Sequence, residues 1–200
     1  FTESYNLLRT QILQRFRENN WNVLAVTSPG GGEGKTLTAI NLAISIARAV
    51  DYTVLLVDAN LRHPWMLEHF GLGEHKGLSD YLTTDTSIEE LLVRTSRNEH
   101  LVLLPGGKRL ERSAEMLSSP KMEDLVSEMK SRYPSRIIIF DLPPVLSSAD
   151  ALAFSPYVDA ALLVVEEGVT QKEDLERAVE LLSSTNIVGT VLNKAEHGKS

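Results

Sequence analysis

A glycine-rich segment at residues 28–36 (SPGGGEGKT) carries the residues with the clearest chemistry. Glycine lets several backbone N–H groups point at one phosphate without a clash from a Cβ atom. The Lys35 ammonium can then reach the β- and γ-phosphates of a nucleotide, and the Thr36 hydroxyl can bind Mg²⁺. Pro29 stands where the strict phosphate-loop pattern has its first glycine. The segment predicts a phosphate-binding loop (P-loop), with the nucleotide-binding residues Gly30, Gly31, Gly32, Glu33, Gly34, Lys35, Thr36 and Leu37.

Two aspartates follow runs of apolar residues and are candidate metal ligands. Asp58 comes after VLLV, and Asp141 comes after IIIF. In open α/β sheets, ligands bind beyond the carboxyl ends of the strands. One aspartate at a strand end is often only a turn or capping residue, but two of them in a chain with a P-loop favour a magnesium site. The expected metal ligands are Thr36, Asp58 and Asp141.

The elements that position these residues are indicated by apolar runs. Near-continuous Val, Ile and Leu indicate strands covered on both faces, as in parallel sheets. Six strands are predicted, at residues 21–27, 53–57, 101–104, 137–140, 160–165 and 187–192. Helices alternate with them; one begins at Lys35 and extends to about residue 50, and others are expected to start near residues 87, 119 and 170. The pattern predicts a doubly wound α/β fold with a mainly parallel sheet flanked by helices, a P-loop NTPase fold.

Length and composition limit which other kinds of site, partner and domain organisation are possible. The chain has 200 residues, no cysteine and a net charge of −7. The lack of cysteine excludes disulfides, zinc–thiolate sites and cysteine nucleophiles. The acidic balance argues against nucleic acid as a partner. No linker or repeat divides the sequence, so one domain is expected over residues 1–200, opening with an amphipathic helix at about residues 2–19.

Seven motifs, in this order, resemble those of the bacterial tyrosine kinases (BY-kinases), the cytoplasmic kinase domains of capsule and exopolysaccharide export systems. They cover nearly the whole chain. The motifs are ESYNLLRTQI at 3–12, TSPGGGEGKT at 27–36, VLLVDANLRHP at 54–64, GLSDYL at 77–82, LLPGG at 103–107, DLPPVLSSADA at 141–151 and VLNKAE at 191–196. The ordered set is far more specific than any one motif.

The resemblance implies ATP- and Mg²⁺-dependent phosphorylation of protein tyrosines. Asp58 would be the general base and Asp141 would hold Mg²⁺ through water. Asn193 would lie where relatives contact the adenine. The catalytic residues implied are Asp58, Lys35, Asn60 and Arg62. The implied partners are tyrosine-bearing proteins, a membrane-embedded activator (a polysaccharide co-polymerase) and neighbouring copies of the kinase, with the chain in the cytoplasm at the inner face of the cell membrane. Because the chain begins at Phe1, a membrane anchor fused upstream would lie outside this sequence.

The sequence departs from the family pattern at several positions. Asn60 replaces the second acid of the D-x-D-x-R motif, and Asn6 replaces the middle arginine of the first helix. We expect Glu3, Asn6 and Arg9 to form a stripe that faces a neighbouring subunit, and the missing arginine to leave a weakly associating chain rather than a stable ring. The family's Asn-Pro is replaced by Arg112-Ser113, and no tyrosine cluster precedes Ser200.

Two other functions remain open from the sequence. A regulatory P-loop ATPase, or degenerate kinase, of the same export systems is consistent with Asn60. A partitioning-type ATPase would carry a signature lysine where this chain has Gly30. Lys108, Arg109 and Arg112 form a small basic patch that is either a solvated loop or a contact for an acidic partner. His63 and His69 are interpreted as surface residues because no pair of carboxylates completes a zinc site with them.

Overall fold

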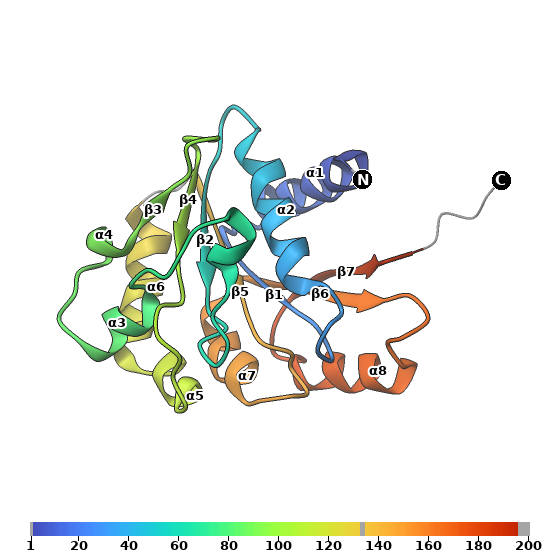
Figure 1. Cartoon of the computed structure of the whole chain (residues 1–200). Helices are drawn as coiled ribbons and strands as arrows, with labels where there is room; N and C mark the ends of the chain where they lie inside the picture. The colour runs from blue at the N-terminus through green and yellow to red at the C-terminus, as the bar shows by residue number, and fades with distance from the viewer. Residues whose placement is uncertain (1, 133–134, 196–200) are drawn as a thin grey trace.

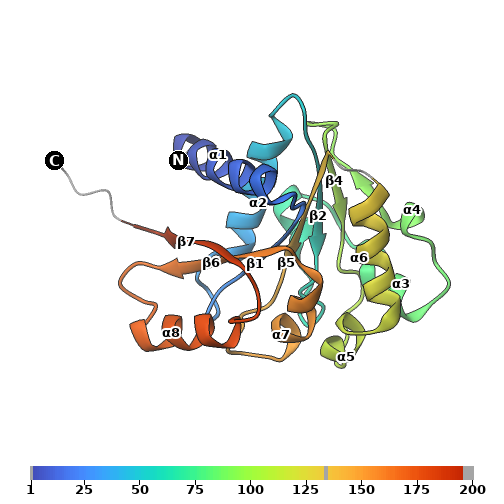
Figure 2. The same cartoon turned by 180° about the vertical axis from the view of Figure 1, so that it is seen from behind.

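The computed structural model describes residues 2–132 and 135–195. A seven-stranded sheet in the order β3-β4-β2-β5-β1-β6-β7 forms its centre, with helices on both faces (Figure 1, Figure 2). All neighbouring strands are parallel except β3 and β4, which are antiparallel. The prediction of a doubly wound, mainly parallel sheet is therefore confirmed.

Six of the strands correspond to the predicted apolar runs. They are β1 (Val23–Thr27), β2 (Thr53–Asp58), β4 (Leu101–Leu104), β5 (Arg136–Asp141), β6 (Ala160–Glu166) and β7 (Ile187–Asn193). The antiparallel edge strand β3 (Val93–Arg94) was not predicted, because two residues are too few to show a pattern. Alternate residues of each buried strand pack on opposite faces; in β1, Val23 contributes to one core and Leu24 to the other. Burial on both faces explains the continuous apolar runs.

Helices cover the two faces unequally. The α-helices are α1 (Thr2–Asn19), α2 (Lys35–Ala47), α3 (Leu78–Thr83), α4 (Ile88–Leu91), α5 (Ser113–Leu117), α6 (Pro120–Arg132), α7 (Asp150–Phe154) and α8 (Lys172–Leu181), with 3₁₀ turns η1 (Met66–Phe70) and η2 (Ser155–Tyr157). One core contains buried residues of α1, α2 and η1, and the other contains buried residues of α3, α4, α5, α6, α7 and α8. Among the described residues, no helix is long and apolar enough to cross a membrane.

The predicted helix starts had different outcomes. Helix α6 begins as expected, with the Ser119 hydroxyl accepting the Met122 N–H at 3.3 Å. Helix α2 begins at Lys35 but already ends at Ala47. Helix α8 begins at Lys172 with Gln171 as its N-cap, close to the predicted start near residue 170, and the Thr170 side chain turns toward the P-loop.

Two of the three residues that were expected to face a neighbouring subunit from α1 contact the same chain. Arg9 Nη1 donates to the carbonyl of Ser45 on α2 at 2.9 Å, and the Ser45 hydroxyl donates to Asn6 Oδ1 at 3.1 Å. Residues three apart on a helix do not lie in line along one face, because a turn contains about 3.6 residues. Asn6 and Arg9 therefore face α2, while Glu3 stays exposed. Asn6 and Arg9 therefore hold α1 to the body of the same chain, and Asn6 is no evidence for weak association between subunits.

Candidate active site

The P-loop joins the end of β1 to the start of α2. Gly32 and Gly34 have φ values of +80° and +87°, in the left-handed region that favours glycine. At Gly34 a Cβ atom would also lie only 2.0 Å from Asn193 Nδ2. Gly34 is therefore required both for its backbone conformation and for close packing against the end of β7.

A set of side chains braces the loop from the side of β6 and β7. Glu33 is buried, and its Oε2 accepts the Gly30 N–H at 2.8 Å while its Oε1 accepts a hydrogen bond from the Thr170 hydroxyl. Asn193 Nδ2 donates to the Glu33 carbonyl at 3.0 Å, and Lys194 Nζ donates to the Gly32 carbonyl at 2.9 Å. Glu33 thus shapes the loop with its side chain. Thr170 was missed as a site residue, since only the fold brings it to the loop.

We predict that Thr170→Val weakens ATP binding without unfolding the chain. Valine has nearly the shape of threonine but leaves the buried Glu33 carboxylate without this donor, which loosens the loop. Hydrogen bonds to charged groups contribute about 1.5–3 kcal/mol, so a loss of about tenfold in affinity is expected by calorimetry. Thr190→Val on the exposed part of β7 is the matched control and is expected to bind ATP as the unmodified chain does. Equal affinities for both variants would show that Thr170 does not brace the loop.

The three expected metal ligands lie at the carboxyl edge of the sheet. Thr36 Oγ1 donates to Asp141 Oδ2 at 2.7 Å, and Lys35 Nζ lies 3.5 Å from Asp141 Oδ1. Asp58 and Asp141 are paired neighbours at the ends of β2 and β5. The fold therefore brings Lys35, Thr36 and both aspartates into one cluster beside the P-loop.

Burial makes Asp58 a weak acid. Its carboxylate accepts backbone N–H groups of Asn60, Trp65 and Met66, each at 3.1 Å. Burial, and then the neighbouring charge of Asp141, nevertheless raise the pKa of Asp58 to about 7. Burial also raises the pKa of Asp141, against the opposing effects of Lys35 and Thr36. A carboxylate with a pKa near neutrality is suited to taking and returning a proton.

The other two expected catalytic residues differ in their surroundings. Asn60 is buried, and its Oδ1 has no hydrogen-bond partner in the described part of the chain. Arg62 Nε forms an ion pair with the buried Asp150 at 3.2 Å. The structure thus shows Arg62 held by Asp150 on α7.

The oxygen atoms of this cluster fit Mg²⁺. Within residues 2–132 and 135–195, no group of three or more His, Cys, Asp or Glu residues has the arrangement to hold a metal ion. Magnesium does not need such a group, since one or two carboxylates with nucleotide phosphates and water suffice. Thr36, Asp58 and Asp141 supply a hydroxyl and two carboxylates of this kind. Of the two histidines interpreted as surface residues, His63 is exposed, whereas His69 is half-buried and its ring lies 4.6 Å from that of Trp65.

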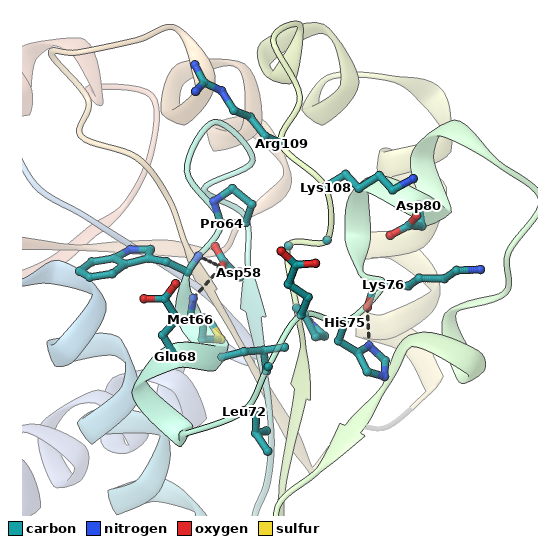
Figure 3. Close-up of a pocket in the computed structure, with 17 residues that line it drawn as sticks. Asp58, Pro64, Met66, Glu68, Leu72, His75, Lys76, Asp80, Lys108 and Arg109 are labelled. Carbon is teal, nitrogen blue, oxygen red and sulfur yellow. Dashed lines mark hydrogen bonds between the residues drawn. The ribbon is translucent and has the colours of Figure 1, made fainter.

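A pocket of about 670 Å³ opens beside Asp58 (Figure 3). Its sides come from residues 64–68, residues 72–76 and the loop 105–109. The loop is fixed to α3, since the Leu78 N–H donates to the Pro105 carbonyl at 2.8 Å and the Ser79 N–H donates to the Gly106 carbonyl at 3.0 Å. The GLSDYL and LLPGG motifs therefore combine to build one side of this pocket.

Comparison with known proteins identifies the family. Residues 21–187 match a family model described as an AAA domain. The chain is 35% identical to the tyrosine-protein kinase YwqD of Bacillus subtilis, over 96% of this chain and 80% of the relative. The chain belongs to the bacterial tyrosine kinase family.

Further relatives agree with this assignment. The tyrosine-protein kinase CpsD of Streptococcus pneumoniae serotype 4 is 33% identical over 97% of this chain and 84% of that protein. The solved kinase domain of the Escherichia coli tyrosine kinase ETK superposes with a TM-score of 0.90 and 26% identity, covering the whole of this chain and 78% of that structure. These relatives support the tyrosine kinase interpretation over a regulatory or partitioning ATPase.

Proposed function

We propose that this bacterial tyrosine kinase transfers the γ-phosphoryl group of ATP to tyrosine hydroxyls of proteins. The position of Asp58 is the observation that supports this most strongly. Asp58 neighbours Asp141 of the P-loop cluster on one side and lines the 670 Å³ pocket on the other. A hydroxyl entering the pocket would thus meet the Asp58 carboxylate next to the site of the nucleotide phosphates.

The residues divide the work as follows. The P-loop backbone and Lys35 would orient the phosphates, while Thr36, Asp58 and Asp141 would hold Mg²⁺. When bound, Mg²⁺ neutralises charge on the phosphate oxygens. The tyrosine oxygen bonds to the γ-phosphorus, the bond from that phosphorus to the β–γ bridging oxygen breaks, and ADP leaves. Asp58 takes the tyrosine proton. Asn193, which packs on Gly34, would line the adenine side of the site, as the family resemblance implies.

The wider role in this proposal comes from the motif resemblance and the kinase relatives. The kinase would act in capsule or exopolysaccharide synthesis, at the cytoplasmic face of the membrane, with a membrane-embedded activator and tyrosine-bearing proteins as partners. Autophosphorylation would use tyrosines that lie outside the cluster of Lys35, Thr36, Asp58 and Asp141.

The direct test is incubation of the full chain with γ-labelled ATP, Mg²⁺ and a tyrosine peptide. We expect label on the peptide as phosphotyrosine, and none on a matched peptide in which phenylalanine replaces tyrosine. Release of inorganic phosphate without phosphotyrosine on any peptide would instead identify an ATPase, the second function that Asn60 leaves open.

Asn60→Asp restores the second acid of the family motif, and we predict that it makes stability and turnover more dependent on Mg²⁺. A third carboxylate beside Asp58 and Asp141 is expected to lower the stability of the metal-free protein by about 1–3 kcal/mol, since it adds an unpaired buried charge. Added Mg²⁺ is expected to recover this loss and to raise turnover at low magnesium. Asn19→Asp, which adds the same charge on the exposed end of α1, is expected to show neither effect. Unfolding and turnover measured over a magnesium titration decide this, and identical curves for both variants would make Asn60 a neutral replacement.

A further inference from the structure

The pocket beside Asp58 is lined by exposed acids, Glu68 and Glu74, and by exposed cations, Lys76, Lys108 and Arg109. Figure 3 shows Glu68 on one side of Asp58, next to Met66, and Lys76 and Lys108 on the other side, with Arg109 above. We call Lys76, Lys108 and Arg109 the basic wall. Two of these cations belong to the basic patch seen in the sequence, whereas its third member, Arg112, does not line the pocket.

The basic wall is available to bind an anion. All three of its side chains are exposed, and none makes a hydrogen bond or ion pair through its charged group within the described residues. The nearby Asp80 carboxylate is buried and accepts the Gly77 N–H at 2.8 Å, so it is already engaged. By contrast, Arg112 pairs with Glu115 at 3.5 Å.

The loop that bears Lys108 and Arg109 is held against the proposed base. A Cβ atom added to Gly106 would lie 3.4 Å from Asp58 Cγ and 2.5 Å from Pro64 Cβ. Since Gly106 is two residues from Lys108 and its carbonyl accepts a hydrogen bond from α3, the backbone that bears Lys108 and Arg109 is held close to Asp58. A chain that places a hydroxyl at Asp58 therefore has its neighbouring residues within reach of these cations.

We infer that this pocket binds the acceptor peptide and that the basic wall selects acidic residues on one side of the tyrosine; this inference rests on the proposed kinase function. The tyrosine ring lies against the exposed Trp65 side chain with its hydroxyl at Asp58. Acidic residues on one side of the tyrosine pair with Lys108 and Arg109. Residues on the other side meet Glu68, which disfavours acids there, so the preference has a direction along the peptide.

The test uses the full chain and fluorescent tyrosine peptides that are identical except for Asp or Ser residues on the N-terminal side, on the C-terminal side or on both. Binding is measured by anisotropy with a non-hydrolysable ATP analogue, and transfer is measured by phosphotyrosine formation. We expect one of the one-sided acidic peptides to bind best. The Lys108→Ala/Arg109→Ala variant is expected to bind that peptide about fivefold more weakly, whereas its affinity for the Ser peptide is expected to be unchanged. Arg112→Ala, a basic residue nearby but outside the pocket, is the matched control and is expected to bind every peptide as the unmodified chain does.

The outcomes separate this inference from the proposed function. Equal binding of the acidic and Ser peptides, or an equal loss in the Arg112→Ala variant, overturns the role of the basic wall. Binding that shows the acidic preference without any phosphotyrosine overturns the kinase function and leaves the selectivity in place. Since ion pairs at exposed sites are screened by salt, the preference is also expected to shrink as ionic strength rises, and a salt-independent preference would contradict a charge-based mechanism.

Discussion

Replacing Lys35 with methionine is expected to reduce the affinity for ATP roughly 100-fold, because the charge-assisted hydrogen bonds from its ammonium to the β- and γ-phosphates are lost. Calorimetric titration measures this directly. Lys194→Met is the matched control, since Lys194 also donates to the P-loop but only to the Gly32 carbonyl, and its side chain is half exposed. A much smaller loss is expected there. Unchanged affinity in the Lys35 variant would overturn the P-loop assignment.

The same substitution has a consequence for stability that the motif does not predict. From the sequence, Lys35 is expected to serve the phosphate and to support little packing. In the structure Lys35 is buried and lies beside the fully buried Asp141. Removing one partner of a buried ion pair costs about 3–5 kcal/mol, but the raised pKa of Asp141 lets that carboxyl take up a proton instead. We therefore expect a loss of about 2 kcal/mol in the free energy of unfolding, and a smaller loss when Asp141→Asn is added.

The fold and the P-loop cluster were predictable because their signals are local. The six long strands are contiguous apolar runs, and the order of strand, glycine loop and helix fixes the position of Lys35 and Thr36. Asp58 and Asp141 were identified because parallel strands end at one edge of a sheet. For each of these residues, the order of neighbouring elements in the sequence was sufficient to predict its position.

The contacts that were missed join residues far apart in the chain. Thr170 reaches Glu33 across 137 positions, and the partner of Asn6 and Arg9 is Ser45, one helix away. The sequence alone is consistent with a helix start near residue 170 and with a stripe at residues 3–9. In the folded chain, however, Thr170 contacts Glu33, and Asn6 and Arg9 contact Ser45. The pocket could not be predicted for the same reason, because the GLSDYL and LLPGG motifs form one of its sides only in the folded chain.

Replacing Asp58 with asparagine is expected to reduce tyrosine phosphorylation strongly while stabilising the metal-free protein at about pH 8. General-base catalysis contributes about 10²–10⁴-fold, and the amide cannot accept the proton, so turnover is expected to fall at least 100-fold. The gain in stability arises because the asparagine side chain carries no charge that must be buried beside Asp141. We expect a gain of about 2 kcal/mol, since the new amide N–H group would face the Asn60 N–H and lose one hydrogen bond.

The sign of the pH dependence distinguishes this explanation from a simple packing effect. The pKa of Asp58 is about 7 in the folded chain and 3.8 as the ordinary value, so between these pH values the folded state binds more protons than the unfolded state. The free energy of unfolding therefore decreases as pH rises from about 4 to about 7, by an amount on the order of 4 kcal/mol for this group. Denaturant titrations in EDTA at a series of pH values measure the slope, which Asp58→Asn is expected to reduce. Asp51→Asn, at an exposed turn, is expected to leave the slope unchanged. A slope that is identical in the Asp58 variant and the unmodified chain would show that burial does not raise the pKa of Asp58 in the metal-free protein.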